Sequence, residues 1–256
     1  MLLAMLLGAV IGLLMGALGG GGAILAVPAL VFIFGFEPQD ATLGSLVVMV
    51  AGTVSGIVNH AKMGSVDLSK GVLFGVLGIA GTYVGRYLAG GVDGNALMLT
   101  FAALLVVVAS LMIKNAATGS QAVSGDRGSG GLMGVIKIIL AALLVGVLVG
   151  FFGVGGGFMI VPTLTLLMGL SMRHAVGTSL VVIFINSVAG LGAGFAQLNQ
   201  LDWGVLSAMA GAAVLAALIG TRIGARVPQK MLKLAFATLL YLVAIYTAIN
   251  SFLAII

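Results

Sequence analysis

The stretch Gly16–Leu30, which reads GALGGGGAILAVPAL, occurs twice in this chain of 256 residues. Its second copy is Gly150–Leu164, GFFGVGGGFMIVPTL, at an offset of 134 residues. Seven positions are identical, namely four glycines, a valine–proline pair and a leucine. Self-similarity at a fixed spacing is the mark of an internal duplication. The pattern therefore predicts two related halves.

The similarity continues beyond the glycine clusters. The matching blocks lie at corresponding places in each half: residues 41–48 and 175–182, and residues 97–109 and 232–244. These matches predict a first transmembrane repeat over residues 1–114 and a second over residues 135–256. Residues 115–134 are rich in glycine and serine, which indicates a flexible linker between the repeats.

Composition identifies the environment of the chain. The sequence is 61% hydrophobic and only 7% charged, whereas about a quarter of the residues in an ordinary soluble domain are charged. Too little polar surface exists for a water-soluble globule. The 11 lysines and arginines lie in short loops, so they indicate membrane topology rather than nucleic-acid binding. Long unbroken apolar runs favour helices over an outer-membrane barrel.

Ten apolar segments are expected, five in each half. They cover residues 2–18, 23–34, 41–60, 71–90 and 96–113, then 135–151, 157–169, 175–197, 203–221 and 231–255. Crossing a bilayer takes about 20 residues, and the segment after each glycine cluster is shorter. We expect an all-α polytopic membrane protein, each repeat having four main transmembrane helices plus a glycine-broken short helix or re-entrant segment. Eight to ten membrane segments result.

The basic residues test how the chain is threaded. If the glycine clusters do not reverse the chain, the 11 basic residues divide five against six between the two sides. If each cluster reverses the chain, ten lie on one side and only Arg86 on the other. The positive-inside rule favours the second threading. It predicts inverted repeats in the cytoplasmic (inner) membrane, a cytoplasmic linker and both termini outside.

Inverted repeats with broken helices are typical of secondary transporters, whose substrate site lies at the midplane between the repeats. Adjacent glycines expose backbone N–H groups, and the helix that follows adds a positive dipole end, which suits an anion. Pro28 and Pro162 are expected to kink these following helices. The candidate substrate-binding residues are the two clusters and nearby polar side chains: Gly19, Gly20, Gly21, Gly22, Ala23, Gly153, Gly155, Gly156, Gly157, Ser45, Thr178, Ser179 and Asn186. Alternatively, the glycines serve close helix packing, and the hydroxyls bond to their own backbone.

The residues that are missing restrict the chemistry. No Asp, Glu, Lys or Arg falls in the middle of a predicted span, which disfavours a carboxylate proton relay and a cation site. His60 and His174 are expected to be interfacial anchors at the cytoplasmic ends, and no metal site or cofactor is predicted. No motif of a nucleotide-binding or hydrolytic enzyme is present, so the chain is not expected to be an enzyme.

The paired motifs G-x-x-G-G-G-G-A-x-L-x-V-P (Gly16–Pro28) and G-x-x-G-x-G-G-G-x-x-x-V-P (Gly150–Pro162) resemble the TauE/SafE family of sulfite exporters and sulfonate permeases. The A-x-x-x-S-L-V-V blocks at Ala41 and Ala175 fit the same family. The resemblance implies transport of a small sulfur-containing anion, such as sulfite, thiosulfate or an organosulfonate, without implying its direction. The expected partners are this anion and the lipid bilayer, and the small-residue helix faces would permit a homodimer. The alternatives are a passive anion channel and a non-transporting membrane assembly partner.

Overall fold

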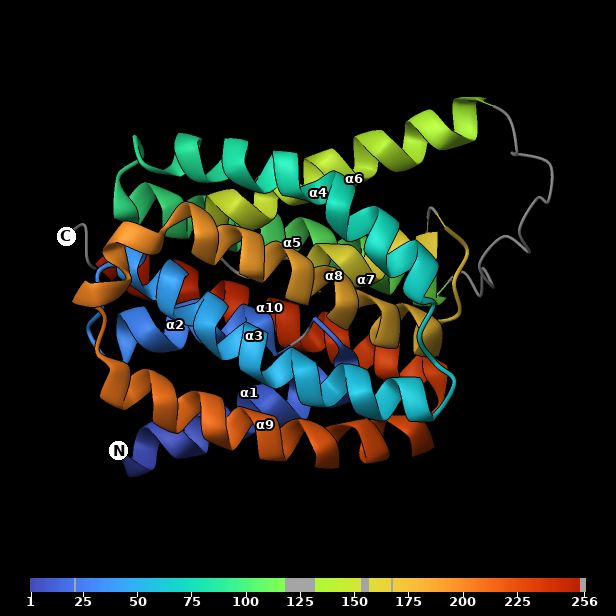
Figure 1. Ribbon diagram of the computed structural model, residues 1–256, viewed down its shortest axis with the longest axis horizontal. Coiled ribbons are helices and arrows are strands. Elements are labelled where there is room, and N and C mark those ends of the chain that lie inside the picture. Colours follow the sequence, from blue (N-terminus) through green and yellow to red (C-terminus); the bar gives the residue numbers. More distant parts are fainter. Residues whose placement is uncertain (21, 118–131, 153–156, 167, 254–256) are drawn as a thin grey trace.

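The computed structural model describes residues 1–20, 22–117, 132–152, 157–166 and 168–253, and within these ranges it is helical and contains no strand. The helices follow one another along a single elongated bundle (Figure 1). Their bounds are α1 Leu2–Leu18, α2 Ala23–Phe32, α3 Pro38–Lys62, α4 Leu68–Ala89, α5 Gly94–Ala117, α6 Leu132–Phe152, α7 Gly157–Leu166, α8 Met172–Ala193, the 3-10 helix η1 Phe195–Gln200, α9 Trp203–Arg226 and α10 Gln229–Leu253.

Length and apolarity divide the helices into two kinds. Six helices of the described chain are long and apolar enough to cross a membrane, namely α3, α4, α5, α8, α9 and α10. Helices α2 and α7 have ten residues each, so each is about 15 Å long, half of the roughly 30 Å hydrocarbon core. The predicted all-α, multi-span class is confirmed. The linker predicted over residues 115–134 lies largely outside the described residues.

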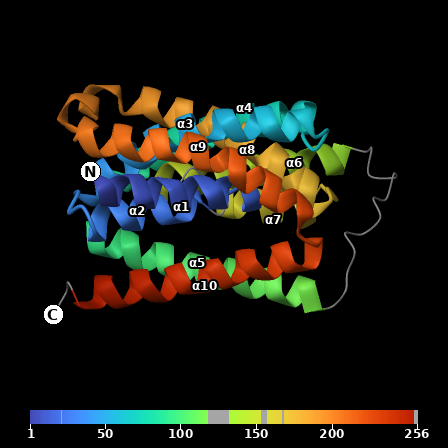
Figure 2. The ribbon, with the colours of Figure 1, turned by 90° about the horizontal axis from the view of Figure 1, so that it is seen from below.

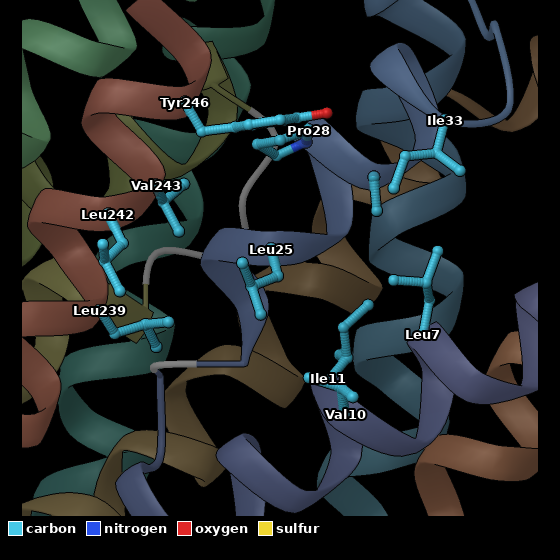
Figure 3. Close-up of a pocket in the computed structure, with 11 residues that line it drawn as sticks. Leu7, Val10, Ile11, Leu25, Pro28, Ile33, Leu239, Leu242, Val243 and Tyr246 are labelled. Atoms are coloured by element: carbon cyan, nitrogen blue, oxygen red, sulfur yellow. The ribbon is translucent and has the colours of Figure 1, made fainter.

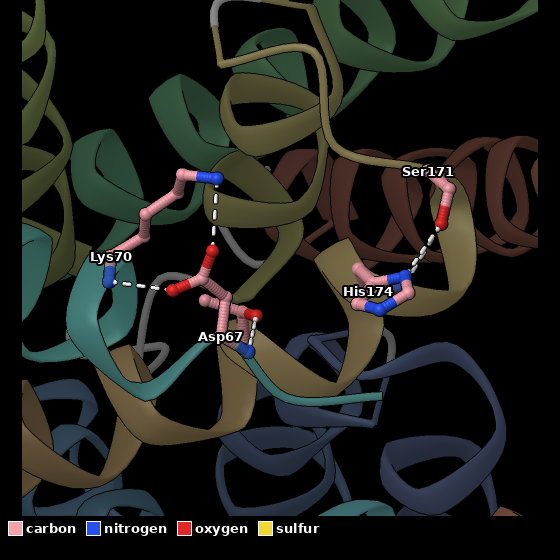
Figure 4. A network of polar contacts seen from close by, with 5 residues as sticks. Asp67, Lys70, Ser171 and His174 are labelled. Carbon is pink, nitrogen blue, oxygen red and sulfur yellow. Dashed lines mark hydrogen bonds and ion pairs between the residues drawn. The ribbon is translucent and has the colours of Figure 1, made fainter. Parts of the chain in front are cut away.

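Local sequence explains where the long helices begin. Asp67 caps α4 by accepting a hydrogen bond from the Lys70 backbone N–H at 3.0 Å, and Asp202 caps α9 through the N–H groups of Gly204 and Val205. Such caps satisfy donors that the first helical turn leaves open. Figure 4 shows the Asp67 cap together with the 2.9 Å ion pair between its carboxylate and Lys70 Nζ. The two caps thus mark where α4 and α9 begin.

Helix α1 packs against α9 through a row of glycines. Gly8, Gly12 and Gly16 lie directly against the backbone of α9 at Met209, Ala213 and Ala217, in that order. The common order shows that the two helices run parallel. Beyond α1 the chain turns back, because Gly22 lies against Ile11 and Met15.

Contacts between helices recur with the two halves exchanged. Helix α1 packs on α9, and its counterpart α6 packs on α4. Helix α2 packs on α3 as α7 packs on α8, while α3 meets α8 and α5 meets α10. Figure 2 shows α5 and α10 side by side along one side of the bundle. The two halves are therefore interleaved rather than separate.

The ends of the bundle differ in charge. Helix α1 begins and α10 ends at one end of the bundle, and α5 ends and α6 begins at the other (Figure 1). Lys62 ends α3 and Arg226 ends α9, while Arg173 lies in the first turn of α8, and these helix ends lie at the end opposite the start of α1 (Figure 1). Arg86, in the last turn of α4, lies at the other end with η1, where it bonds Gln197 Oε1 at 2.7 Å.

Candidate anion site at the glycine turns

The first half's glycine cluster meets the start of α7 inside the bundle. Gly20, which follows α1, contacts Gly157, the first residue of α7, backbone to backbone. A Cβ atom on either glycine would overlap the backbone of the other. Gly19 also has a φ of +68°, which residues with a side chain rarely adopt. Gly21, Gly153, Gly155 and Gly156 of the predicted site lie outside the described residues.

One face of α8 lines these turns. A Cβ atom on Gly19 would lie 2.5 Å from Ser179 Oγ and 2.9 Å from the Val176 carbonyl, and one on Gly157 would lie 2.7 Å from Ile183. Residues spaced by three and four lie on the same face of a helix, so Ser187 continues this row one turn beyond Ile183. Val176, Ser179, Ile183 and Ser187 are all buried.

The serines predicted to bind the anion are held by their own helices. Ser179 Oγ donates to the Val176 carbonyl at 2.7 Å, and Ser45 Oγ, its repeat equivalent, donates to the Thr42 carbonyl at 2.8 Å. This is the backbone-bonded alternative that the sequence left open. A hydroxyl has one hydrogen to donate, so either serine must rotate away from its own helix to donate to an anion.

Thr178 has a different role in this structure. Its Oγ1 accepts a hydrogen bond of 2.9 Å from the Asp67 backbone N–H. It therefore ties the first half of α8 to the start of α4, at the end of the bundle where the α3–α4 connection lies (Figure 1).

Like Thr247 and Ser251 of α10, Asn186 and Ser187 of α8 are buried polar side chains that lack a hydrogen-bond partner among the described residues. Asn186 and Ser187 are both fully buried. The Asn186 amide lies over α4, where a Cβ atom on Gly78 would lie 3.1 Å from Oδ1 and 3.2 Å from Nδ2. A buried polar group without a partner costs about 1–3 kcal/mol. This cost makes the two residues candidates for contact with a ligand.

Ser187 is absent from the residues that the sequence predicted as site residues. At the offset of 134 residues its equivalent is Thr53, which donates to the Met49 carbonyl at 2.7 Å. The equivalent of Asn186 is Gly52. The signal available in the sequence was the spacing of Ser187 from Ser179, which places both on one helix face.

Helix α2 supplies a free helix start beside the turns. It begins at Ala23 with Gly22 as the preceding residue, and no side chain caps it. The start of a helix carries a partial positive charge and unpaired N–H groups. Pro28 lies inside α2 and Pro162 inside α7, and proline lacks the N–H that would bond the carbonyl one turn earlier. The kinks predicted at these prolines stay a prediction.

No charged side chain of the described residues is buried at the candidate site. In the described residues the buried polar side chains are threonines, serines, one asparagine and one histidine, with no acid, lysine or arginine among them. The described residues also contain no group of three or more histidines and acids that could hold a metal ion. The site is thus uncharged, apart from the dipoles of the helices that start there.

The cavity seen at the surface of α2 is of another kind. It measures about 310 Å³ and lies between α1, α2 and α10, lined by apolar side chains that include Leu25, Pro28 and Leu242 (Figure 3). Tyr246 brings the single hydroxyl group of its lining. A cavity of this composition suits hydrocarbon and would not hold a small anion.

The expectation that His60 is an interfacial anchor is wrong. Its side chain is 3% exposed, and its two ring nitrogens lie 2.9 Å from the Gly16 carbonyl and 2.9 Å from Ser65 Oγ. The neighbouring Lys62 is exposed, and its charge led to the expectation that His60 also lies at a helix end on the surface. His174 is exposed and contacts Ser171 Oγ at 2.9 Å (Figure 4).

Comparison with known proteins identifies the family of this fold. The family model described as "Sulfite exporter TauE/SafE" matches residues 4–247. The chain belongs to the TauE/SafE family. Its members are membrane transporters, which agrees with six apolar helices long enough to span a bilayer.

Curated relatives cover almost the full chain. A "Probable membrane transporter protein" of Xylella fastidiosa (strain 9a5c) is 30% identical over 253 residues, which is 97% of this chain and 95% of the relative. "Probable membrane transporter protein YdhB" of Bacillus subtilis (strain 168) is 26% identical over 231 residues, 88% of this chain and 91% of the relative. No solved structure matches the chain.

Proposed function

We propose that this chain transports a small sulfur-containing anion, such as sulfite, thiosulfate or an organosulfonate, across the cytoplasmic membrane. The anion is held near mid-membrane, where the glycine turns of the two halves meet. One observation carries the proposal: Gly20 and Gly157 touch, and Gly19 and Gly157 lie against Ser179 and Ile183 on one face of α8. The family model supports the sulfur chemistry, since its description names a sulfite exporter.

The chemistry of the site favours an anion over a cation. Backbone N–H groups at a helix start and side-chain hydroxyls are hydrogen-bond donors that carry no full charge. Ser187 and the Nδ2 of Asn186 have hydrogen atoms to donate and no protein acceptor among the described residues. An anion entering the site would satisfy these donors and remove their desolvation cost.

We also propose that the α1–α2 and α6–α7 hairpins are re-entrant and that the two repeats are inverted, with both termini outside. The exchange of contacts between the halves supports the inversion. The basic residues at the ends of α3 and α9 and at the start of α8 support a cytoplasmic location for that end of the bundle, through the positive-inside rule. Two such hairpins meeting at their tips give one site between two pseudo-equivalent gates.

The membrane potential supplies enough energy for a simple carrier to export an anion. Moving one negative charge outward across about 100 mV, inside negative, releases roughly 2.3 kcal/mol. No further energy source is needed for an anion that is exported. An imported anion needs a coupled cation, because the same voltage then opposes its movement.

Ligand-induced stabilisation tests the site directly. A ligand that binds only the folded protein stabilises it by about 2.7 kcal/mol at 100 times its dissociation constant. We expect sulfite, thiosulfate or methanesulfonate to raise the unfolding temperature of the purified chain, and acetate to leave it unchanged. Ser187→Ala is expected to weaken this binding about 10-fold or more, as the loss of a hydrogen bond to a charged group does.

The matched control is Ser207→Ala, because Ser207 is exposed and bonds only its own helix at Gly204. It should bind the anion as the wild type does. Stabilisation by none of the sulfur anions, or equal binding by both serine variants, would overturn the proposed site.

A further inference from the structure

We propose that His60 is a proton-binding site and that its protonation is coupled to anion transport. The inference rests on the proposed function, because it concerns what travels with the anion. His60 lies in the last turn of α3, close to the charged end of the bundle, yet its side chain is 3% exposed. Within the described residues it is the one buried side chain with a titratable group.

The two ring nitrogens have fixed partners. Nε2 lies 2.9 Å from the Gly16 carbonyl oxygen, which can only accept, so Nε2 carries a hydrogen and donates it. Nδ1 lies 2.9 Å from Ser65 Oγ. Ser65 Oγ also lies 3.1 Å from the backbone carbonyl of His60. The serine hydroxyl therefore has two acceptors within reach and one hydrogen.

This network satisfies both protonation states of the ring. In the neutral state the Ser65 hydroxyl donates to Nδ1. When a proton from water binds Nδ1, the new N–H donates to Ser65 Oγ, and the hydroxyl hydrogen turns to the His60 carbonyl. The ring gains one proton and one positive charge, and the bond to Gly16 is kept. Only one hydroxyl rotation separates the two states.

The position of Gly16 connects this proton site to the glycine turn. Gly16 lies in the last turn of α1, three residues before Gly19, and Gly19 contacts Ser179 in the candidate anion site. A positive charge held at this place attracts an anion in the turn. By linkage, a bound anion favours protonation of His60 to the same degree. The two ligands are then carried together as an electrically more neutral pair.

The charged residues around His60 do not provide a negative partner for the protonated ring. Gly177 of α8 packs against the His60 side chain, and α8 brings Arg173 and His174. Helix α9 brings Arg222 and Arg226, the start of α4 brings Asp67 and Lys70, α3 itself brings Lys62, and α1 has no titratable side chain. Asp67 is paired with Lys70, and no carboxylate of the described residues bonds the ring. A charged His60 therefore finds its negative partner in the anion.

The internal duplication indicates how many protons move with each anion. At the offset of 134 residues the counterpart of His60 is Gly194, so the second half has no equivalent proton site. We expect one proton to move with each anion, in the same direction, so a doubly charged anion such as thiosulfate still carries one negative charge across the membrane.

Flux in proteoliposomes tests the coupling. Full-length chain is reconstituted, the membrane potential is clamped at zero, and uptake of thiosulfate and of methanesulfonate is measured under an inward proton gradient of about two pH units around the titration range of histidine. We expect the gradient to drive uptake at least about 10-fold above the level without a gradient, and an internal pH dye to report proton entry with the anion. His60→Gln should lose both effects and keep potential-driven anion flux. His174→Gln, the matched control, should behave like the wild type.

A second variant distinguishes proton binding by His60 from a purely structural role of its side chain. Ser65→Ala leaves His60 in place but removes the acceptor of the protonated ring, so the pH profile of uptake should shift by about one unit toward acid. Potential-driven flux that is indifferent to the proton gradient, or a His60→Gln variant that still carries protons, would overturn the inference alone. Absence of flux under every gradient would instead overturn the proposed function, and the inference with it.

Discussion

At the residue scale, the site depends on two glycines that have no room for a side chain. Gly20 and Gly157 come from opposite halves of the chain and touch through their backbones. Glycine costs a helical protein conformational entropy, so close backbone approach is the physical reason for placing it here. Further along α8, Asn186 and Ser187 are buried without partners in the described part of the chain, which is a cost that ligand binding would recover.

Gly20→Ala and Gly157→Ala are each expected to lower anion flux at least about tenfold, equivalent to roughly 1.4 kcal/mol, because the added methyl overlaps backbone that cannot move aside. Gly211→Ala is the control, since Gly211 lies in α9 with no atom within 4 Å of the added methyl. Flux is measured in proteoliposomes with equal amounts of inserted protein. Wild-type flux in both variants would show that the close contact is not needed.

Asn186→Leu is expected to stabilise the protein without ligand by about 1–3 kcal/mol, because it removes a buried amide that lacks partners. The same variant should lose anion-dependent stabilisation and flux. Asn250→Leu serves as the control, since Asn250 is only half-buried and bonds the Tyr246 carbonyl at 2.8 Å. Thermal unfolding in detergent, with and without the anion, measures the stability of the two variants, and proteoliposome flux measures their transport. A destabilised Asn186→Leu protein that transports normally would assign Asn186 to structure.

At the element scale, helices pack through glycine rows where their backbones touch. Helix α1 presents Gly8, Gly12 and Gly16 to α9, and α4 presents Gly81 and Gly85 to α6. In a membrane no hydrophobic force drives helices together, and small residues gain van der Waals contact instead. The sequence left open whether glycines serve close helix packing, and the glycines of these rows do serve it.

Gly12→Leu is expected to destabilise the protein by about 1–3 kcal/mol or more, because overpacking a close helix contact forces the backbones apart. Gly211→Leu places the same side chain on α9 where no atom lies within 4 Å. Unfolding temperatures of the two purified variants are compared. Equal stability would contradict the α1–α9 contact.

The cap of α4 predicts a pH dependence of stability. The hydrogen bond and ion pair with Lys70 lower the pKa of Asp67, which lies just before the membrane-spanning helix. A lowered pKa contributes stability above the ordinary pKa of the group, and that contribution is lost as the pH falls through the lowered value. Asp67→Asn should therefore be less stable than the wild type at neutral pH, and the difference should close in acid.

The difference in unfolding temperature between wild type and Asp67→Asn is followed from neutral to acid pH. Lys70→Gln should reduce this difference, because it removes the main cause of the lowered pKa. A difference that stays constant down to the lowest pH would mean that Asp67 stabilises α4 through uncharged capping alone.

At the scale of the whole molecule, much of the architecture followed from the repeated glycine motif and the apolar runs. The expected segments 41–60 and 203–221 fall within α3 and α9, because helices in a membrane must satisfy their backbone internally. The expected run 175–197 is too long, since α8 ends at Ala193 and a 3-10 helix follows. The burial of His60 was not predictable, because its partner Gly16 comes from another helix and leaves no local signal.

Threading across the membrane is testable because the chain contains no cysteine. Lys62→Cys and Asn199→Cys introduce single thiols at exposed positions at opposite ends of the bundle. We expect a membrane-impermeant maleimide to label Asn199→Cys in intact cells and to label Lys62→Cys only after the membrane is opened. The reverse pattern would place both termini in the cytoplasm, and labelling of both in intact cells would contradict the threading.

The central claim is that the meeting glycine turns carry a sulfur-containing anion. The most direct measurement is flux of sulfite, thiosulfate and methanesulfonate in proteoliposomes under an imposed membrane potential, with sulfate and acetate as comparison anions. We predict saturable, potential-driven flux of at least one sulfur anion, with counterflow, and its loss in Gly20→Ala. No flux of any of these anions through folded, inserted protein, or flux that Gly20→Ala leaves unchanged, would contradict the claim.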